Sequence, residues 1–171
     1  DTYDIQPMVI IDLIKYWEPE TTGIVDFNEV KSYVFSIKNA GFNIRKITFD
    51  RWNSTTMIKA MNEAGIGSEL LSVATIHYDE LMMFIADNRL AGPRLPRLVD
   101  DMLHLQLIKG KVDHPSTGYG KDLSDAVCGA LWNAAKLTYR DQDQEVQIMD
   151  YQQVSDALRE ELRTASRPGK V

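Results

Sequence analysis

Apolar positions along the chain form strand-length runs that alternate with helical stripes. Met8–Tyr16 is a nearly continuous apolar run, β-branched at its centre, and it predicts a core strand. A helix is expected after it, beginning at the capping residue Asp26 and ending at Gly41. Ile44–Asp50 predicts the next strand. Because a strand, a helix and a strand follow one another, we expect a parallel pair with a right-handed crossover.

The rest of the chain continues with short apolar segments separated by glycine and proline. We expect first a helix capped by Asn53 or Ser54 and ended by Gly65, and then a further short strand at Leu70–Thr75. A helix at Asp79–Arg89, with Leu81, Phe84 and Ile85 on one face, and a helix from Pro96 to about His104 are expected next. A hairpin turning at Lys109–Lys111 and a long helix at Asp122–Tyr139 complete the set. These elements predict an α/β domain over residues 1–145. Residues 146–171 are expected to form an amphipathic helix and a tail.

Composition and charge narrow the class of protein. With 171 residues, of which 44% are hydrophobic and 26% charged, the chain suits one globular domain with a sizeable core. No apolar run reaches the length needed to cross a bilayer. Cys128 is the only cysteine, which excludes a disulfide framework and a cysteine-based zinc site. Its apolar neighbours predict that this thiol is a small buried hydrophobe.

Charge is distributed unevenly along the chain. The net charge of −6 argues against a protein that coats nucleic acid, although a nuclease site must itself be acidic to hold metal. Between Arg89 and Lys121, basic side chains outnumber acidic ones. This segment is either a phosphate-facing edge or an ordinary solvated surface. Lys121 itself has the same two interpretations.

Three carboxylates stand where α/β proteins place ligands. Asp50 ends an apolar strand, and the carboxyl ends of strands are where ligands collect in open sheets. Asp122 and Asp125 open the long helix, three residues apart, so both can point the same way. Each acid also has a structural interpretation: Asp50 can cap the turn or helix that follows its strand, and Asp122 and Asp125 can cap the long helix or interact favourably with its dipole. Together they form a pattern typical of carboxylates that hold Mg²⁺ or Mn²⁺.

The order of several motifs resembles the nuclease domain of tailed-phage large terminase subunits. The motifs are Ile47-Thr48-Phe49-Asp50-Arg51-Trp52-Asn53-Ser54, the helix that ends in Ala64-Gly65-Ile66, Val112-Asp113-His114-Pro115, and Gly120-Lys121-Asp122-Leu123-Ser124-Asp125-Ala126. Val9 to Leu13, Val25-Asp26-Phe27 and Asn88-Arg89-Leu90 also fit. The resemblance covers roughly residues 8 to 138, and its specificity lies in the ordered set.

This resemblance implies a fold, a reaction and a set of partners. The fold is ribonuclease H-like, with a mixed central sheet flanked by helices. The activity is cleavage of concatemeric double-stranded viral DNA during packaging, with two Mg²⁺ or Mn²⁺ ions held by acidic residues. Asp50 matches the strand-tip ligand, Asp122 the helix-start ligand, and Asp125 the second acid of that motif. The implied partners are the terminase ATPase domain, the portal and the small terminase subunit, in the host cytoplasm at the procapsid and without a membrane.

The sequence also departs from the family pattern. The family's other essential aspartate lies on a strand that precedes the residue matching Met8. Only Asp1 and Asp4 precede it here, in a polar stretch, and Asp12 is a fallback that matches a different strand. No Gly-x-x-x-x-Gly-Lys-Ser/Thr phosphate loop occurs. We therefore expect a piece of a longer protein, a nuclease domain short of its first strand.

Two other functional interpretations stay open. The chain can be a noncatalytic module that docks on the portal or the small subunit. It can also be another ribonuclease H-like nuclease, such as a resolvase or a transposase, although the Glu expected in their final helix motif is absent. The three histidines are scattered, which favours structural or surface roles, with His114 in the loop before Asp122 as the exception to watch. Trp52 is expected to pack beside the site.

Overall fold

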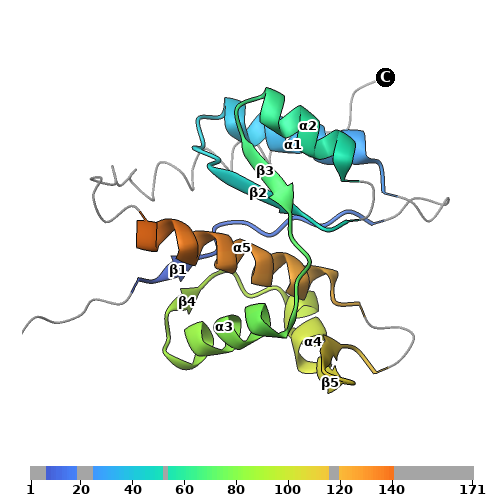
Figure 1. Ribbon diagram of the computed structural model, residues 1–171, viewed down its shortest axis with the longest axis vertical. Helices are drawn as coiled ribbons and strands as arrows, with labels where there is room; N and C mark the ends of the chain where they lie inside the picture. Colours follow the sequence, from blue (N-terminus) through green and yellow to red (C-terminus); the bar gives the residue numbers. More distant parts are fainter. Residues whose placement is uncertain (1–6, 19–24, 52–53, 116–119, 141–171) are drawn as a thin grey trace, which may run out of the picture.

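The computed structural model describes residues 7–18, 25–51, 54–115 and 120–140, and these residues form an α/β protein. Its strands pair two by two into three small sheets. The longest helix, α5 (Asp122–Arg140), lies between two groups of elements, one on each side of it (Figure 1). None of the helices in the described ranges is long and apolar enough to span a membrane.

The first group is built around a parallel strand-helix-strand unit. β2 (Lys46–Phe49) and β3 (Gly67–Leu70) pair in parallel in their full length, and α2 (Thr55–Glu63) connects them. α1 (Phe27–Asn39) lies beside α2 over the sheet (Figure 1). Apolar side chains from α1, α2 and β2 meet in one cluster, with these residues at its centre: Met57, Met61 and Ile66.

Capping residues set the ends of these helices. The Asp26 side chain accepts a hydrogen bond from the Asn28 backbone N–H at 2.8 Å and so begins α1. Gly41 follows α1 with a φ of 99°, and Gly65 follows α2 with a φ of 74°. Glycine adopts this left-handed conformation without strain, so both helices end where the sequence predicts.

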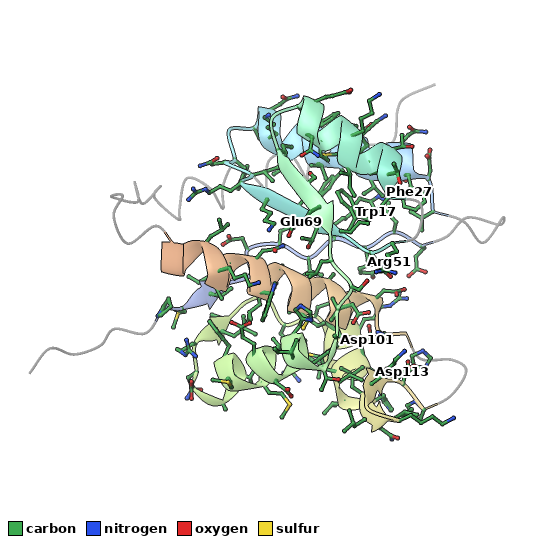
Figure 2. All side chains as sticks on the ribbon, viewed as in Figure 1. Trp17, Phe27, Arg51, Glu69, Asp101 and Asp113 are labelled. Atoms are coloured by element: carbon green, nitrogen blue, oxygen red, sulfur yellow. The ribbon has the colours of Figure 1, made fainter. Side chains whose placement is uncertain are left out.

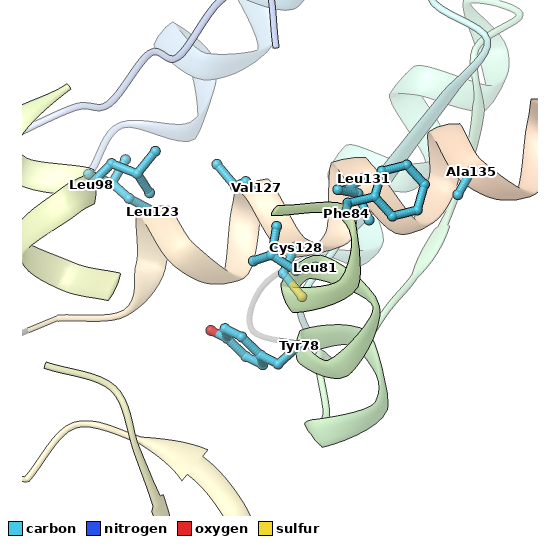
Figure 3. Packing of buried hydrophobic residues seen from close by; sticks show 9 residues of the cluster. All are labelled: Tyr78, Leu81, Phe84, Leu98, Leu123, Val127, Cys128, Leu131 and Ala135. Carbon is cyan, nitrogen blue, oxygen red and sulfur yellow. The ribbon is translucent and has the colours of Figure 1, made fainter. Parts of the chain in front are cut away.

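The second group surrounds a larger apolar core. α3 (Thr75–Ala86), α4 (Pro96–Leu103) and one face of α5 supply its buried side chains (Figure 3). β1 (Val9–Ile10) and β4 (Leu90–Ala91) pair in parallel beside it. The cluster consists of Tyr78, Leu81, Phe84, Leu98, Leu123, Val127, Cys128, Leu131 and Ala135.

The predicted hairpin is present and has the expected turn. β5 (Gln106–Ile108) and β6 (Lys111–Asp113) pair antiparallel. The two turn residues, Lys109 and Gly110, have φ values of 51° and 79°. Positive φ at both central positions is the geometry that a two-residue hairpin needs to match the twist of its strands. The predictions for α4 and α5 are likewise confirmed.

The strand predictions need correction. Met8–Tyr16 forms a strand only at Val9–Ile10, and it pairs with β4 instead of with the strand that leads to Asp50. Its partner is short because Pro93, two residues after β4, has no N–H to continue the ladder. The parallel pair joined by a helix is therefore β2 with β3. The strand expected at Leu70–Thr75 lies earlier, at Gly67–Leu70, where it matches β2 in register. Within the described residues the strands do not join into one central sheet.

The helix expected at Asp79–Arg89 also differs from the prediction. It begins at Thr75, where the His77 ring Nδ1 accepts a hydrogen bond from the backbone N–H of the N-cap residue Ala74 at 2.9 Å. Ile85, expected on the inward face, is 50% exposed. The predicted C-terminal helix and tail at 146–171 lie outside the described residues, as do Asp1, Asp4 and Trp52.

Candidate metal-binding groove

A groove runs between β2 and α5, at the boundary of the two groups of elements. Its volume is about 550 Å³. One wall follows β2 and the segment after β3, and the other follows the side of α5 that faces β2. It is lined by Lys46, Ile47, Thr48, Phe49, Asp50, Leu71, Ser72, Val73, Lys121, Asp122, Asp125, Ala126, Gly129, Ala130 and Asn133.

All three predicted site carboxylates line this groove. Asp50 follows the last residue of β2, while Asp122 and Asp125 lie in the first turn of α5. β2 and α5 are in contact with each other, and each supplies one wall of the groove. The two stretches that carry the family resemblance therefore lie across one cleft from each other.

The acids differ in what holds them. The Asp50 Oδ1 atom accepts a hydrogen bond from the Arg51 backbone N–H at 2.6 Å, and the residue is exposed. Asp125 accepts two hydrogen bonds, one from the Tyr78 hydroxyl at 2.6 Å and one from the Lys121 ammonium at 2.8 Å. Asp122 is exposed at the start of α5. Asp125 is thus the most firmly held of the three.

Polar contacts join the two walls farther along the groove. The Asn133 side-chain amide donates to the Thr48 hydroxyl at 3.0 Å, and Asn133 is only 8% exposed. Gly129 lies where α5 packs closely on the other wall, because an added Cβ would stand 3.3 Å from a Leu71 methyl group and 3.6 Å from the Thr48 hydroxyl. The missing side chain of Gly129 and the hydrogen bond from Asn133 to Thr48 therefore set the distance between α5 and β2.

Burial fixes the protonation of two side chains behind the acids. Burial raises the pKa of Tyr78, and its hydrogen bond to Asp125 raises it further. Burial, followed by the nearby Asp125 charge, raises the pKa of the Cys128 thiol to about 12. Both groups are neutral at physiological pH, so Tyr78 is a hydrogen-bond donor and Cys128 is the inert buried hydrophobe that the sequence predicts.

Asp101 is a carboxylate that the sequence pattern did not single out. It lies on α4, is 8% exposed and accepts a hydrogen bond from the Leu123 backbone N–H, at the beginning of α5 (Figure 2). Burial raises its pKa. It lines a smaller cavity of about 280 Å³ that Asp122 also lines. The sequence did contain one indication of its burial: Asp101 follows the buried Leu98 by three residues and so lies on the same helical face.

Three of the six basic side chains from Arg89 to Lys121 form ion pairs within the protein. Arg89 pairs with Asp87, Arg97 with Glu18, and Lys121 with Asp125. Lys46 lies in the groove as well and pairs with Glu69 at 2.7 Å. These pairs do not decide between a phosphate-facing edge and a solvated surface.

The histidines lie away from the groove lining. His77 is buried and packs edge-on against Trp132, with ring centroids 4.4 Å apart. His104 lies beside Asp100 in α4, and His114 lies 3.8 Å from the Asp113 carboxylate. The cap on α3 gives His77 a structural role.

The groove residues fit a hard divalent cation in their donor chemistry. Among the described residues, no group of three or more His, Cys, Asp or Glu side chains converges on a single point that could hold a metal ion. Mg²⁺ does not require such convergence, because it commonly binds through one or two carboxylates and completes its shell with water and substrate phosphates. In addition, the Lys121 ammonium shows that a positive charge is accommodated next to Asp125.

Comparison with known proteins identifies no relative of this chain. The chain matches no protein-family model, and no curated protein and no solved structure matches it.

Proposed function

We propose that this chain is a metal-dependent endonuclease domain of the large terminase subunit of a tailed phage, with a ribonuclease H-like fold. Its substrate would be concatemeric double-stranded DNA. The observation that carries the proposal is that Asp50, Asp122 and Asp125 line one groove although they come from opposite walls of it. The ordered motifs that resemble this family include the same three acids.

Each group in the groove has a defined task in such a reaction. Asp50 and Asp122 would hold the divalent ions, with Asp125 as a third or supporting carboxylate. Two bound Mg²⁺ or Mn²⁺ ions supply activation of a water molecule and stabilisation of the leaving 3′ oxygen in phosphodiester hydrolysis. Lys121 and Lys46, which line the same groove, offer positive charge to a DNA phosphate.

Cleavage of supercoiled plasmid in the presence of Mg²⁺ or Mn²⁺ tests this function. The assay uses the longest natural protein that contains this chain, because the family's first aspartate has no evident match in it. We expect Asp50→Asn and Asp122→Asn each to lower the cleavage rate by about 100-fold or more, since even residues that only support metal ligands cost about 10–100-fold.

A matched control locates the effect in the groove. Asp100→Asn removes an exposed carboxylate of α4, 62% exposed, that does not line the groove. This variant should cut at the wild-type rate. Unchanged cleavage by Asp50→Asn would contradict the site assignment, and loss of cleavage in Asp12→Asn would assign the missing ligand to Asp12.

A second candidate is a noncatalytic module that docks on the portal or the small terminase subunit. Exposed apolar side chains on α4 and the β5–β6 hairpin favour it, with Leu103 77% and Leu107 67% exposed. Exposed apolar surface of this kind is common at protein interfaces. Titration of the protein with Mn²⁺ in a calorimeter discriminates the two candidates, because a docking module would show no binding that depends on the three groove acids.

A further inference from the structure

The Asp125 carboxylate is held by two side chains of different character. Its Oδ1 atom accepts a hydrogen bond from the Tyr78 hydroxyl at 2.6 Å, across the α3–α5 contact. Its Oδ2 atom accepts one from the Lys121 ammonium at 2.8 Å, one helical turn earlier in the chain. The two partners therefore engage different oxygen atoms of the same carboxylate.

The two partners of Asp125 differ in how deeply they are buried. Tyr78 is 6% exposed and packs in the large core beside Leu81 and Cys128, with its hydroxyl oxygen pointing away from the helix that carries it (Figure 3). Tyr78 is not among the residues that line the groove, so it reaches Asp125 from the core side. Lys121 does line the groove, and its side chain and that of Asp125 are each 28% exposed.

This difference decides which contact is permanent. A tyrosine ring enclosed by core side chains has little freedom to turn, so its hydroxyl stays within hydrogen-bond distance of Oδ1. Lys121 is partly in contact with water, which weakens its ion pair with Asp125, so it can leave that carboxylate more easily than the buried tyrosine can. Oδ1 is thus tied to the core, whereas Oδ2 is exchangeable on the groove side.

We propose that Tyr78 is a positioning residue of the metal site: its hydroxyl fixes Asp125 through Oδ1 and leaves Oδ2 available to a divalent cation once Lys121 moves aside. This inference rests on the proposed function. Ligands of metal ions are commonly oriented by hydrogen bonds from residues behind them. Tyr78 supplies that support from α3, an element that carries none of the three acids.

Tyr78→Phe is the variant that isolates the hydroxyl, because it keeps the ring in the core. In the full natural protein, titration with Mn²⁺ alone is expected to show about 10-fold weaker binding than wild type. Plasmid cleavage should fall at low Mn²⁺ and recover as Mn²⁺ is raised. Asp125→Asn should show a deficit that added Mn²⁺ does not restore.

Leu81→Val is the matched control for a merely structural role. Leu81 lies one turn after Tyr78 on α3 and is 3% exposed. Its side chain has no polar atom that could hold a groove residue in place. Its truncation lowers stability, and Mn²⁺ affinity should stay within about twofold of wild type. If Leu81→Val weakens Mn²⁺ binding as much as Tyr78→Phe does, the effect comes from general loosening of the core and the positioning role is wrong.

The outcomes separate this inference from the proposed function. If wild type binds Mn²⁺ and cuts DNA while Tyr78→Phe does both with unchanged Mn²⁺ dependence, the inference is overturned and the proposed function stands. If wild type neither binds Mn²⁺ nor cuts, the proposed function fails and the positioning role fails with it. Weaker Mn²⁺ binding in Tyr78→Phe, with recovery at high Mn²⁺ and a normal Leu81→Val control, supports the inference.

Discussion

The hydrogen bond between Thr48 and Asn133 offers the sharpest test of how the groove is held together. It joins β2, which leads to Asp50, to α5, which begins with the other two acids. Removing either side chain's polar group leaves the backbone of both walls intact. Thr48→Val deletes the hydroxyl with almost no change of shape, and Asn133→Ala deletes the amide.

The expected magnitude follows from burial and geometry. The donor–acceptor distance is 3.0 Å and Asn133 is 8% exposed, so the bond has normal geometry and is partly buried. A neutral hydrogen bond of this kind contributes about 0.5–1.5 kcal/mol net, and leaving a buried partner unsatisfied costs about 1–3 kcal/mol. Thr48→Val leaves the buried Asn133 amide without this partner, so we expect it to lower the free energy of unfolding by about 2 kcal/mol. Asn133→Ala leaves the less buried Thr48 hydroxyl without its partner, so we expect a loss of about 1 kcal/mol.

Urea denaturation of both single variants and the double variant measures the coupling. The double variant should lose less stability than the sum of the two single losses, by about 0.5–1.5 kcal/mol, because the same bond is broken in each. Thr48→Val combined with Leu81→Val should be additive, because Thr48 does not belong to the core cluster that contains Leu81. Additivity of Thr48→Val and Asn133→Ala within about 0.3 kcal/mol would refute the claim that this bond ties the walls.

Three further predictions concern other parts of the molecule. Gly92→Ala should lower the free energy of unfolding by about 1–3 kcal/mol in a urea titration, since an added Cβ would stand 2.9 Å from the Ile11 Cβ. Cys128 should stay unmodified by iodoacetamide at neutral pH in the folded protein, because its pKa is raised to about 12 and it is buried; rapid labelling without unfolding would contradict its placement. Burial raises the pKa of Asp101 above its ordinary 3.8, so the folded protein binds its proton more tightly than the unfolded chain. The stability of wild type relative to Asp101→Asn should therefore fall as the pH rises through the range just above 3.8, and a pH-independent difference would contradict this assignment.

Local signals in the sequence predicted the features that depend on a few neighbouring residues. Gly41 and Gly65 end their helices with positive φ, and Lys109-Gly110 turns the hairpin. The positions of Asp50 after a strand and of Asp122 at a helix start could also be read locally. Each of these depends on backbone conformation within one turn, which residue type strongly restricts.

Features that depend on pairing between distant segments could not be predicted. An apolar run such as Met8–Tyr16 predicts a buried segment, whereas Met8, Ile10 and Tyr16 are exposed here. The run also contains nothing that selects β4 as its partner or limits the strand to two residues. The bond between Tyr78 and Asp125 joins positions 47 apart in sequence. Asp101 was missed for the same reason, because its burial depends on contact with the start of α5.

The same limit applies to the sheet. Strand-length runs predict how many strands a chain can form, and ladder hydrogen bonds then decide which of them join. Here Phe49 and Leu71 continue the β2–β3 ladder by a backbone hydrogen bond of 2.9 Å, whereas the three pairs of strands stay separate within the described residues. The ribonuclease H-like arrangement therefore remains part of the proposal.

The most direct test of the metal-binding groove is a crystal structure of the protein soaked in Mn²⁺, examined by anomalous scattering. The account predicts Mn²⁺ peaks in the groove, bound directly to carboxylate oxygens of Asp50 and Asp122, with Lys121 moved away from Asp125. Full occupancy of Mn²⁺ at sites elsewhere on the protein, with none beside these three acids, would contradict it.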